Sequence, residues 1–310
     1  MTTKKQAFSA QFSADGKDLS DPSVGIRRAI PLALAAALAA PGGAHAGVTA
    51  GMRIGYDSNV DRSVDEPRGE GYGSALVTWG RDAPGEDRLE WTAALSGEAT
   101  AYLGLEDLDT AALAGEAGLL WVPKAGWTLS AVPFAQARAV RDTDQSAVAL
   151  GVRAGLRRQL KAAWYVAGSC AYTDSRAREE VYSFREHAVG AALGAEWTPR
   201  LSTEMGYQFS RGDSFRAVGD AGGPALLRPL PVARRGPGGP GGNGPRTYAS
   251  GAFGEDLVSE IVDQHAVGVT LGLQGPGILS WSAGYWYAVS NGDSGTAVRH
   301  EVFVGGSLAL

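Results

Sequence analysis

The chain has 310 residues, of which 44% are hydrophobic and only 20% charged, and its formal net charge is −5 at pH 7. This balance argues against a nucleic-acid-binding protein, because such proteins neutralise phosphates with an excess of lysine and arginine. A single cysteine, Cys170, excludes an intrachain disulfide scaffold and a cysteine-based zinc site, and a mean hydropathy of −0.11 excludes a bundle of transmembrane helices.

The first 46 residues have the layout of a secretory signal peptide. An arginine pair at 27–28 precedes a twelve-residue apolar run at 29–40, and Ala-His-Ala at 44–46 matches a small-x-small cleavage site. Twelve helical residues rise about 18 Å, which is too short for a hydrocarbon core of about 30 Å. We therefore expect cleavage near Ala46 and export of residues 47–310 in a Gram-negative-type cell.

The rest of the chain alternates between apolar and polar residues over long segments. In 89–103 the odd positions are apolar or small and the even positions are mostly polar, which is typical of a strand with one apolar face. Strands of a soluble sandwich usually stop after five or six residues. The other segments of this kind are 48–56, 72–79, 111–121, 127–140, 148–156, 164–172, 187–197, 201–209, 266–273, 278–289 and 298–310. Together they predict twelve membrane-spanning strands.

Short and long connections alternate between the predicted strands. Short turns, such as 123–126 and 198–200, alternate with longer loops, of which the Gly/Pro-rich loop at about 212–259 is the longest. An even number of strands with short periplasmic turns and longer outer loops is the layout of an outer-membrane barrel. The predicted fold class is all-β, a transmembrane antiparallel up-and-down β-barrel of about twelve strands over 47–310, with both termini in the periplasm.

Aromatic residues gather at the two ends of the predicted strands. Indole and phenol groups prefer the boundary between water and hydrocarbon, so two such belts predict the girdles of a barrel in contact with outer-membrane lipid. A soluble sandwich would instead place its aromatic residues at strand centres. The predicted girdles are Trp79, Trp91, Trp121, Trp127, Trp164, Trp197 and Trp281 beside the short turns, and Tyr56, Tyr72, Tyr102, Tyr172 and Tyr207 beside the longer loops.

At this point the chain resembles outer-membrane β-barrel proteins of porin-like architecture over residues 47–310. The alternating apolar residues that end at Leu310 resemble the C-terminal signal read by the outer-membrane insertion machinery, although that signal usually ends in Phe or Trp. The segment at 55–60, Gly-Tyr-Asp-Ser-Asn-Val, resembles a motif of export-associated barrels. Those include surface lipoprotein assembly modifiers and barrels encoded with exopolysaccharide systems, so the resemblance implies a link to export.

The polar face of the predicted barrel carries charged residues among many glycines and alanines. The predicted pore-lining residues are Arg53, Glu98, Glu116, Arg138, Arg153, Arg157, Glu196 and Glu204. Glu98 and Glu116 are equidistant from the centre of the 105–109 loop, so we expect them to face each other and to need a counter-charge from Arg138 or Arg153. Small residues do not fill a twelve-stranded interior, which must hold water, a loop or a ligand. The charges either set up a transverse field in a narrow pore or only stiffen the barrel.

One set of residues resembles a protease site. Asp142 and Asp144 together with Asp263 and His265 are similar to the Asp-x-Asp and Asp-x-His pattern of omptin proteases, which implies His265 as the base and Asp263 as its orienting group. Omptin barrels have ten strands, however, and the surrounding sequence differs. The sequence shows no phosphate-cradling loop, dinucleotide fingerprint or metal-ligand spacing, so we expect neither a cofactor nor a metal.

The sequence therefore favours a non-enzymatic barrel. The leading hypothesis is a narrow channel or export pore for small solutes or a polymer, gated by the 212–259 loop. The alternative is a non-conducting envelope anchor or adhesin that presents this loop to a periplasmic or surface protein partner. An omptin-like rim protease comes third.

Overall fold

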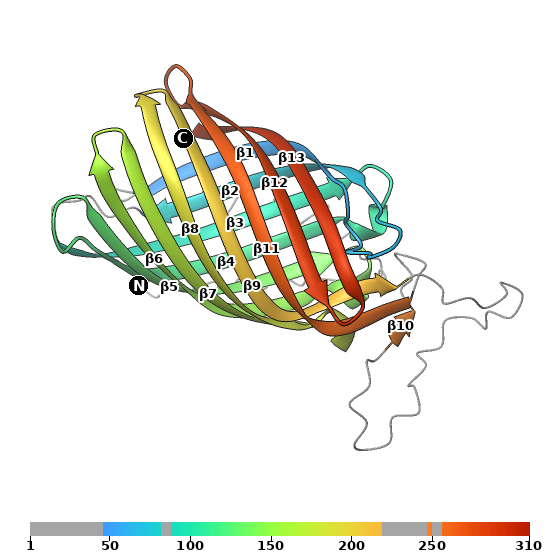
Figure 1. Ribbon diagram of the computed structural model, residues 1–310. Helices are drawn as coiled ribbons and strands as arrows, with labels where there is room; N and C mark the ends of the chain where they lie inside the picture. The colour runs from blue at the N-terminus through green and yellow to red at the C-terminus, as the bar shows by residue number, and fades with distance from the viewer. Residues whose placement is uncertain (1–45, 82–87, 219–246, 250–255) are drawn as a thin grey trace, which may run out of the picture.

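The structure, a computed structural model, describes residues 46–81, 88–218, 247–249 and 256–310, which form a barrel of antiparallel strands (Figure 1). The strands are β1 (Ala46–Asp57), β2 (Glu70–Arg81), β3 (Leu89–Tyr102), β4 (Thr110–Trp121), β5 (Trp127–Val140), β6 (Ala147–Lys161), β7 (Trp164–Ala177), β8 (Phe184–Thr198), β9 (Leu201–Val218), β10 (Thr247–Ala249), β11 (Asp256–Gln274), β12 (Leu279–Gly292) and β13 (Gly295–Ala309). The predicted signal peptide lies outside the described residues, except for Ala46, with which β1 begins. In the described part, no helix is long and apolar enough to cross a membrane.

Twelve of these strands close into a ring. Each strand from β1 to β9 pairs with its neighbour along the chain, β9 pairs with β11, and β13 closes the ring on β1 over nine residue pairs from Thr49↔Ala309 to Asp57↔Glu301. The short β10 adds only to the outer end of β11. Closure pairs every ring strand on both sides, which removes the exposed edges of an open sheet. This confirms the predicted twelve-stranded antiparallel barrel.

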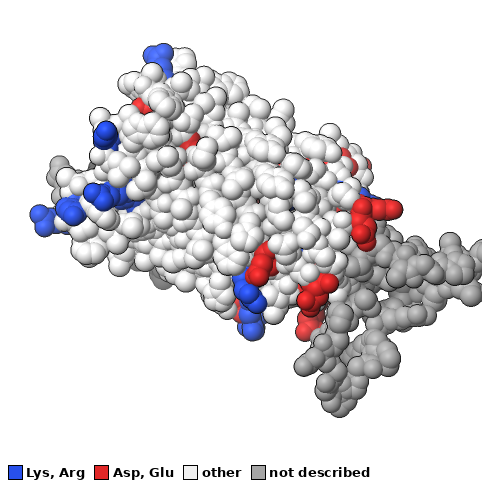
Figure 2. All heavy atoms as spheres, viewed as in Figure 1, with Lys and Arg blue, Asp and Glu red and all other residues white. Residues whose placement is uncertain are grey.

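The two faces of the wall differ in chemistry. One face exposes large apolar side chains, such as Met52 at 73% and Ile54 at 68% exposure, and Figure 2 shows a broad uncharged band with the charges gathered at the two ends. The other face is polar, and its side chains bond across an intervening strand, as Arg157 on β6 does with Glu196 on β8 at 3.2 Å. Contacts over two strands indicate the concave side of the wall. The polar face therefore lines the lumen, and the apolar face is suited to lipid.

The aromatic side chains follow the predicted girdles with two exceptions. The tryptophans beside the short turns share the outward register of the strands, and the rings of Trp164 and Trp197 lie 5.3 Å apart at right angles. Tyr72 and Tyr102 were expected in the outer girdle, but they lie in the lumen. Tyr72 pairs with Gly55 on the inward face, and its hydroxyl donates to Glu301 at 2.7 Å. Nearness to a strand end does not decide the face, because a shift of one residue reverses it.

Three of the long-loop connections share one construction. Each contains a single 3-10 turn, namely Glu106–Leu108, Thr143–Gln145 and Glu180–Tyr182. In each loop the side chain of the residue after the turn accepts a hydrogen bond from the N–H of the preceding strand, as Ser146 Oγ does from the Val140 N–H at 3.0 Å. Backbone hydrogen bonds then join neighbouring loops, because the Asp142 N–H donates to the carbonyl of Asp107 at 2.8 Å. These loops therefore form a continuous rim.

A buried apolar cluster spans the mouth at this end of the barrel. Its members are Leu108, Val181, Tyr182, Ala217 and Leu257, and we call this cluster the lid. Leu108 belongs to the β3–β4 loop and Ala217 to β9, yet four strands lie between β4 and β9 on one side of the ring and six on the other. Residues from nearly opposite walls meet in the lid. The mouth is thus bridged by apolar packing.

The predicted long loop at 212–259 is shorter in the structure than expected. The β9–β11 ladder continues to Val218↔Asp256, so both ends of the predicted loop are strand. Strand pairing persists here because the apolar residues Ala217 and Leu257 belong to the lid, where both are fully buried. The Gly/Pro-rich centre of the predicted loop lies outside the described residues.

The segment at 55–60 has a structural role at the exit of β1. The Asn59 side chain is 2% exposed, donates to the carbonyls of Ser63 at 2.9 Å and Val298 at 3.0 Å, and accepts from the Ser63 N–H at 2.9 Å. We expect Asn59→Ala to lower the free energy of unfolding by about 2–4 kcal/mol, because three hydrogen bonds of a buried side chain are lost. Denaturant unfolding of the refolded barrel measures this. Asn291→Ala, at an exposed asparagine, is the control, and an equal loss in both variants would contradict the role.

Candidate functional site

The lumen is the candidate functional site. All eight predicted pore-lining residues lie on the face of their strands opposite the exposed apolar residues; Arg53, for example, alternates with Met52 and Ile54. In cross-strand register they pair mostly with small inward residues, such as Ser74 opposite Arg53 and Ala112 opposite Glu98. The polar groups therefore stand on a wall of small residues.

The luminal arginines are held against the wall. Arg153 is hydrogen-bonded to Glu116 and stacks over Phe134, with its guanidinium carbon 4.9 Å from the ring centroid. Arg157 stacks over Tyr165 at 3.7 Å and Arg53 over Phe303 at 4.4 Å. A guanidinium held by a carboxylate and an aromatic face keeps its charge in one place.

The expected pairing of Glu98 with Glu116 is wrong. Glu98 lies opposite Ala112, and Glu116 lies opposite Ala94. The reason is that the last residues of β3 pair with β2 and not with β4. Tyr102 pairs with Tyr72 on β2, whereas the pairing of β3 with β4 begins only at Thr100↔Thr110. The counter-charge of Glu116 is Arg153, one of the two arginines expected for that role.

A second charged cluster lies at the long-loop end of the lumen. Arg299 bridges Asp57 at 2.6 Å and Glu301 at 3.4 Å. Arg216 and Glu260 form an ion pair at 2.8 Å, and their side chains are only 1% and 4% exposed. The sequence reasoning missed these residues. The alternation of Arg299 and Glu301 with apolar residues on β13 would have indicated two of them, but Arg216 fell inside the predicted loop and Glu260 just after it, outside the predicted strands.

Arg62 reaches into this cluster from the β1–β2 loop. It is the one non-glycine residue with a positive φ, 57°, in the described part of the chain, and it donates to Ser214 Oγ at 2.5 Å. The surrounding protein removes water from the Arg62 guanidinium and the positive charge of Arg299 repels it, so the pKa of Arg62 is lowered to about 10. Arg62 therefore stays protonated at neutral pH.

Trp286 also faces the lumen, unlike the other tryptophans. Its indole lies over Gly268, where a Cβ would come within 2.3 Å of the ring, and its edge reaches Gly206. The two glycines let the indole lie flat on the wall. In the sequence, Trp286 differs from the other tryptophans because it is remote from a short turn and because its even position has the opposite parity to Trp281 on the same strand.

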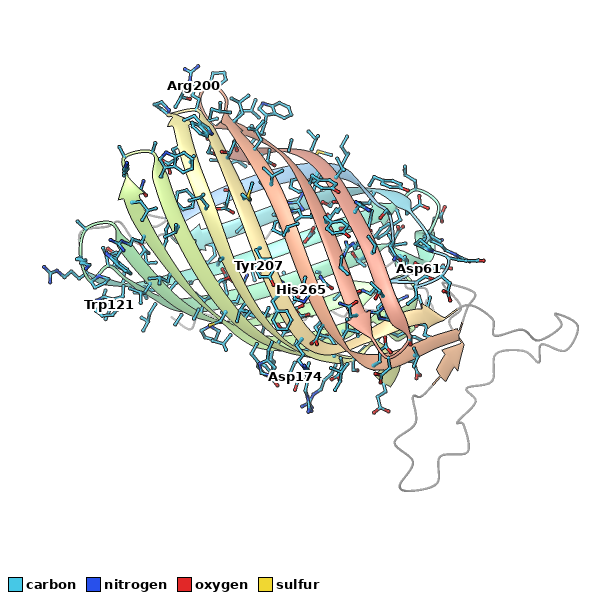
Figure 3. All side chains as sticks on the ribbon, in the orientation of Figure 1. Asp61, Trp121, Asp174, Arg200, Tyr207 and His265 are labelled. Carbon is cyan, nitrogen blue, oxygen red and sulfur yellow. The ribbon has the colours of Figure 1, made fainter. Side chains whose placement is uncertain are left out.

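The residues of the protease-like pattern do not come together. Asp142 accepts from the Asp144 N–H at 3.3 Å and caps the turn between β5 and β6. Asp263 pairs with Arg211, and His265 is bonded to the Tyr207 hydroxyl at 2.8 Å on the outward face of β9 and β11 (Figure 3). The His265 imidazole therefore points away from the lumen. In the described ranges, no group of three His, Cys, Asp or Glu side chains could hold a metal ion.

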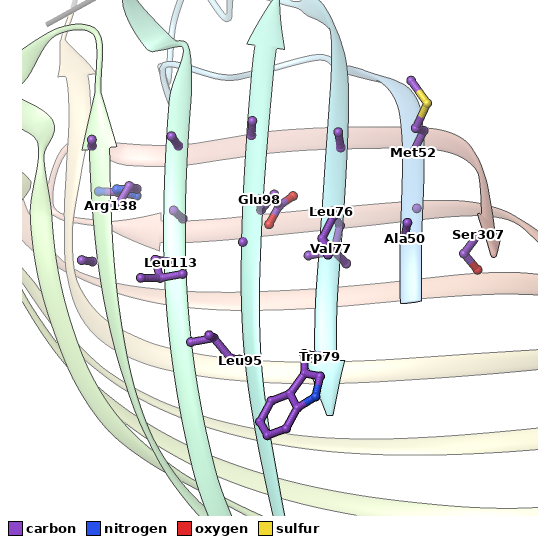
Figure 4. A pocket seen from close by; sticks show the side chains of 18 of the residues that line it. Ala50, Met52, Leu76, Val77, Trp79, Leu95, Glu98, Leu113, Arg138 and Ser307 are labelled. Atoms are coloured by element: carbon purple, nitrogen blue, oxygen red, sulfur yellow. The ribbon is translucent and has the colours of Figure 1, made fainter. Parts of the chain in front are cut away.

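A large, mostly apolar groove runs along the β1–β5 side of the barrel (Figure 4). Its lining includes the outward residues Met52, Val77, Trp79, Leu95 and Leu113, and it also reaches Glu98 and Arg138, two of the predicted pore-lining residues. Polar groups contribute little to it. Such a surface suits lipid chains rather than a water-soluble molecule, so the lumen remains the candidate site.

The closed ring, apolar exterior and polar lumen define a membrane β-barrel of the outer-membrane type, and structural comparison agrees. The fold is similar to that of the COG4313 outer membrane channel from Pseudomonas putida F1, with a TM-score of 0.53, 12% identity, and coverage of 87% of this chain and 99% of that chain. The KdgM porin matches with a TM-score of 0.43 and 8% identity over 84% of this chain and 99% of its own, and the NanC porin with 0.45 and 9% over 84% and 100%. No protein-family model and no curated protein matches the sequence. At these identities the likeness concerns the fold alone, a closed antiparallel β-barrel like that of the COG4313 outer membrane channel.

Proposed function

We propose that the protein resides in outer-membrane lipid as a narrow channel for small solutes. The observation that supports this most directly is the lumen of a twelve-stranded ring, lined by polar groups on a wall of glycine and alanine. Eight-stranded barrels are filled by their own side chains, whereas a wider ring with small inward residues keeps space for water and solute. The proposal contains no catalytic step and no cofactor, and insertion is assigned to the outer-membrane insertion machinery.

The lid gives the proposed channel a closed outer mouth. The ends of β9 and β11 form part of the lid and flank the long Gly/Pro-rich segment. A movement of this hairpin would separate Ala217 and Leu257 from Leu108 and open the mouth. We therefore assign gating to the 212–259 stretch as part of the proposal.

Planar bilayers test the channel. Refolded 47–310 should show small, stepwise conductance, and deletion of 219–246 should change the open probability, because this segment connects the two strands that carry the lid. Circular dichroism and heat-modifiable gel migration serve as folding controls. The proposal fails if the folded wild type and the folded deletion variant are both silent.

Silence in both proteins would favour the second candidate function. The lid bridges the mouth with apolar side chains, and a permanently closed barrel is what an envelope anchor or adhesin requires. In that case the long outer segment would be presented to a surface partner. Binding of the folded, non-conducting barrel to such a partner, lost on deletion of 219–246, would support it.

A further inference from the structure

Part of the luminal wall keeps its hydrogen-bonding groups unused. Arg157 and Glu196 bond to each other, and Tyr165 donates to Glu204. On the neighbouring stretch of β7 to β9, the side chains of Ser169, Thr173, Glu186 and Gln208 form a different group. Within the part of the chain that the structure describes, they take part in none of the side-chain hydrogen bonds of the wall. Their donors and acceptors are thus free to meet a solute.

These side chains surround a shallow floor of small residues. The cross-strand pairs Ala171↔Ala188 and Ser169↔Gly190 make the floor, and Gly190 is also paired with Gln208 on the next strand. Thr173 and Glu186 pair directly at one end of the floor, and Arg153 pairs with Ala171 at its side. The ring therefore consists of Arg153, Ser169, Thr173, Glu186 and Gln208, which come from four successive strands.

The ring borders a cavity of about 260 Å³, which is lined by these five residues together with Cys170, Ala171, Ala188 and Val189. Pockets for drug-sized ligands measure about 300–1,000 Å³, so this cavity suits a smaller molecule. A residue larger than alanine on the floor would remove this space. The cavity is therefore of the size of a single small solute.

The charges of the ring are nearly balanced. The charge of Arg153 is compensated by Glu116, to which it is bonded. Glu186 interacts electrostatically with the positive charge of Arg62, which lies at the mouth. No uncompensated cation is left to attract an anion, and an anionic solute would meet Glu186. The ring instead contains hydrogen-bond donors, acceptors and hydroxyls that can do both. This mixture suits a solute with hydroxyl groups, because a hydroxyl donates and accepts at the same time.

We propose that this cavity is a binding site for a neutral polyhydroxylated solute of monosaccharide size. The Gln208 amide and the Ser169 and Thr173 hydroxyls bond its hydroxyl groups, and Glu186 accepts from them. Arg153, held against Phe134, closes one side. The inference deepens the proposed channel by naming the class of its solute.

Saturation-transfer NMR on detergent-solubilised 47–310 tests the site with glucose as the probe. Glucose should show saturation transfer and bind in the millimolar range, and glucuronate, which differs by one carboxylate, should bind at least tenfold more weakly. Gln208→Ala and Ala188→Leu should each weaken glucose binding at least tenfold. Gln136→Ala, at a luminal glutamine of β5 outside the cavity, should leave it unchanged.

Each outcome decides between the two proposals. The site is overturned if glucose does not bind the folded wild type, if glucuronate binds as tightly, or if Ala188→Leu and Gln136→Ala have equal effects. Glucose binding that depends on Gln208, in a barrel without conductance, would retain the site and refute the channel. Conductance without glucose binding would retain the channel and refute the site.

Discussion

Replacing Glu260 with alanine should release the lid. The change leaves the Arg216 guanidinium, 1% exposed, without its counter-ion, and it removes the acceptor of the Ser294 N–H and hydroxyl. An unpaired buried charge costs about 3–5 kcal/mol. The rest of β9 and β11 stays hydrogen-bonded to its neighbours in the ring. The outer ends of these two strands should therefore detach while the barrel remains folded. Hydrogen–deuterium exchange at 214–218 and 256–262 should rise strongly, and conductance should increase.

Two further variants make the Glu260 result decisive. Glu106→Ala breaks the exposed Arg141–Glu106 pair at the same end of the barrel, and it should cost less than about 1 kcal/mol and leave exchange in the hairpin unchanged. The double variant Arg216→Met with Glu260→Leu removes both charges and should restore protection. Wild-type exchange in Glu260→Ala would show that the ion pair does not hold the lid.

An arginine on the outward face of β11 should be far more costly than one on its inward face. Val269 is 44% exposed and lies midway between His265 at the outer boundary and Leu273 beside the inner turn. At the bilayer midplane, Val269→Arg should lower the free energy of unfolding by about 2–4 kcal/mol. Guanidinium unfolding of the barrel in lipid vesicles measures this.

The adjacent residue provides the matched control. Thr270 faces the lumen opposite Glu204, so Thr270→Arg places the same side chain in water beside a carboxylate. Its effect should stay within about 1 kcal/mol. Equal costs at 269 and 270 would mean that the apolar face of β11 does not meet lipid.

Much of the barrel could be predicted from local patterns. A strand that crosses a membrane must present one apolar face to lipid. Successive side chains point to opposite faces, so apolar residues recur at every second position of each strand. The twelve predicted strands therefore all appear in the structure. The inward face of Arg53 and Glu204 could also be predicted, because each alternates with apolar residues along its strand. Parity also explains why Trp286 stands apart from the other tryptophans.

The register and the lid depend on contacts between distant segments. The offset of Glu98 from Glu116 follows from the pairing of the end of β3 with β2, which no spacing within the β3–β4 hairpin reveals. Tyr102 lies in the lumen because it shares the even positions of β3 with Glu98 and Thr100. Loop length alone predicts only a symmetric hairpin, and here a neighbouring strand breaks that symmetry.

The sequence by itself determined the number of strands, their faces and their order around the ring, because lipid imposes those features on each strand separately. The tertiary structure decided what closes the mouth and where unpaired polar groups remain. Leu108, Ala217 and Leu257 come from opposite walls, and Ser169, Glu186 and Gln208 from three strands. These residues come together only once the ring has closed and the stagger between neighbouring strands is fixed. Their packing and hydrogen bonding depend on distances between strands, which the alternation along one strand does not determine.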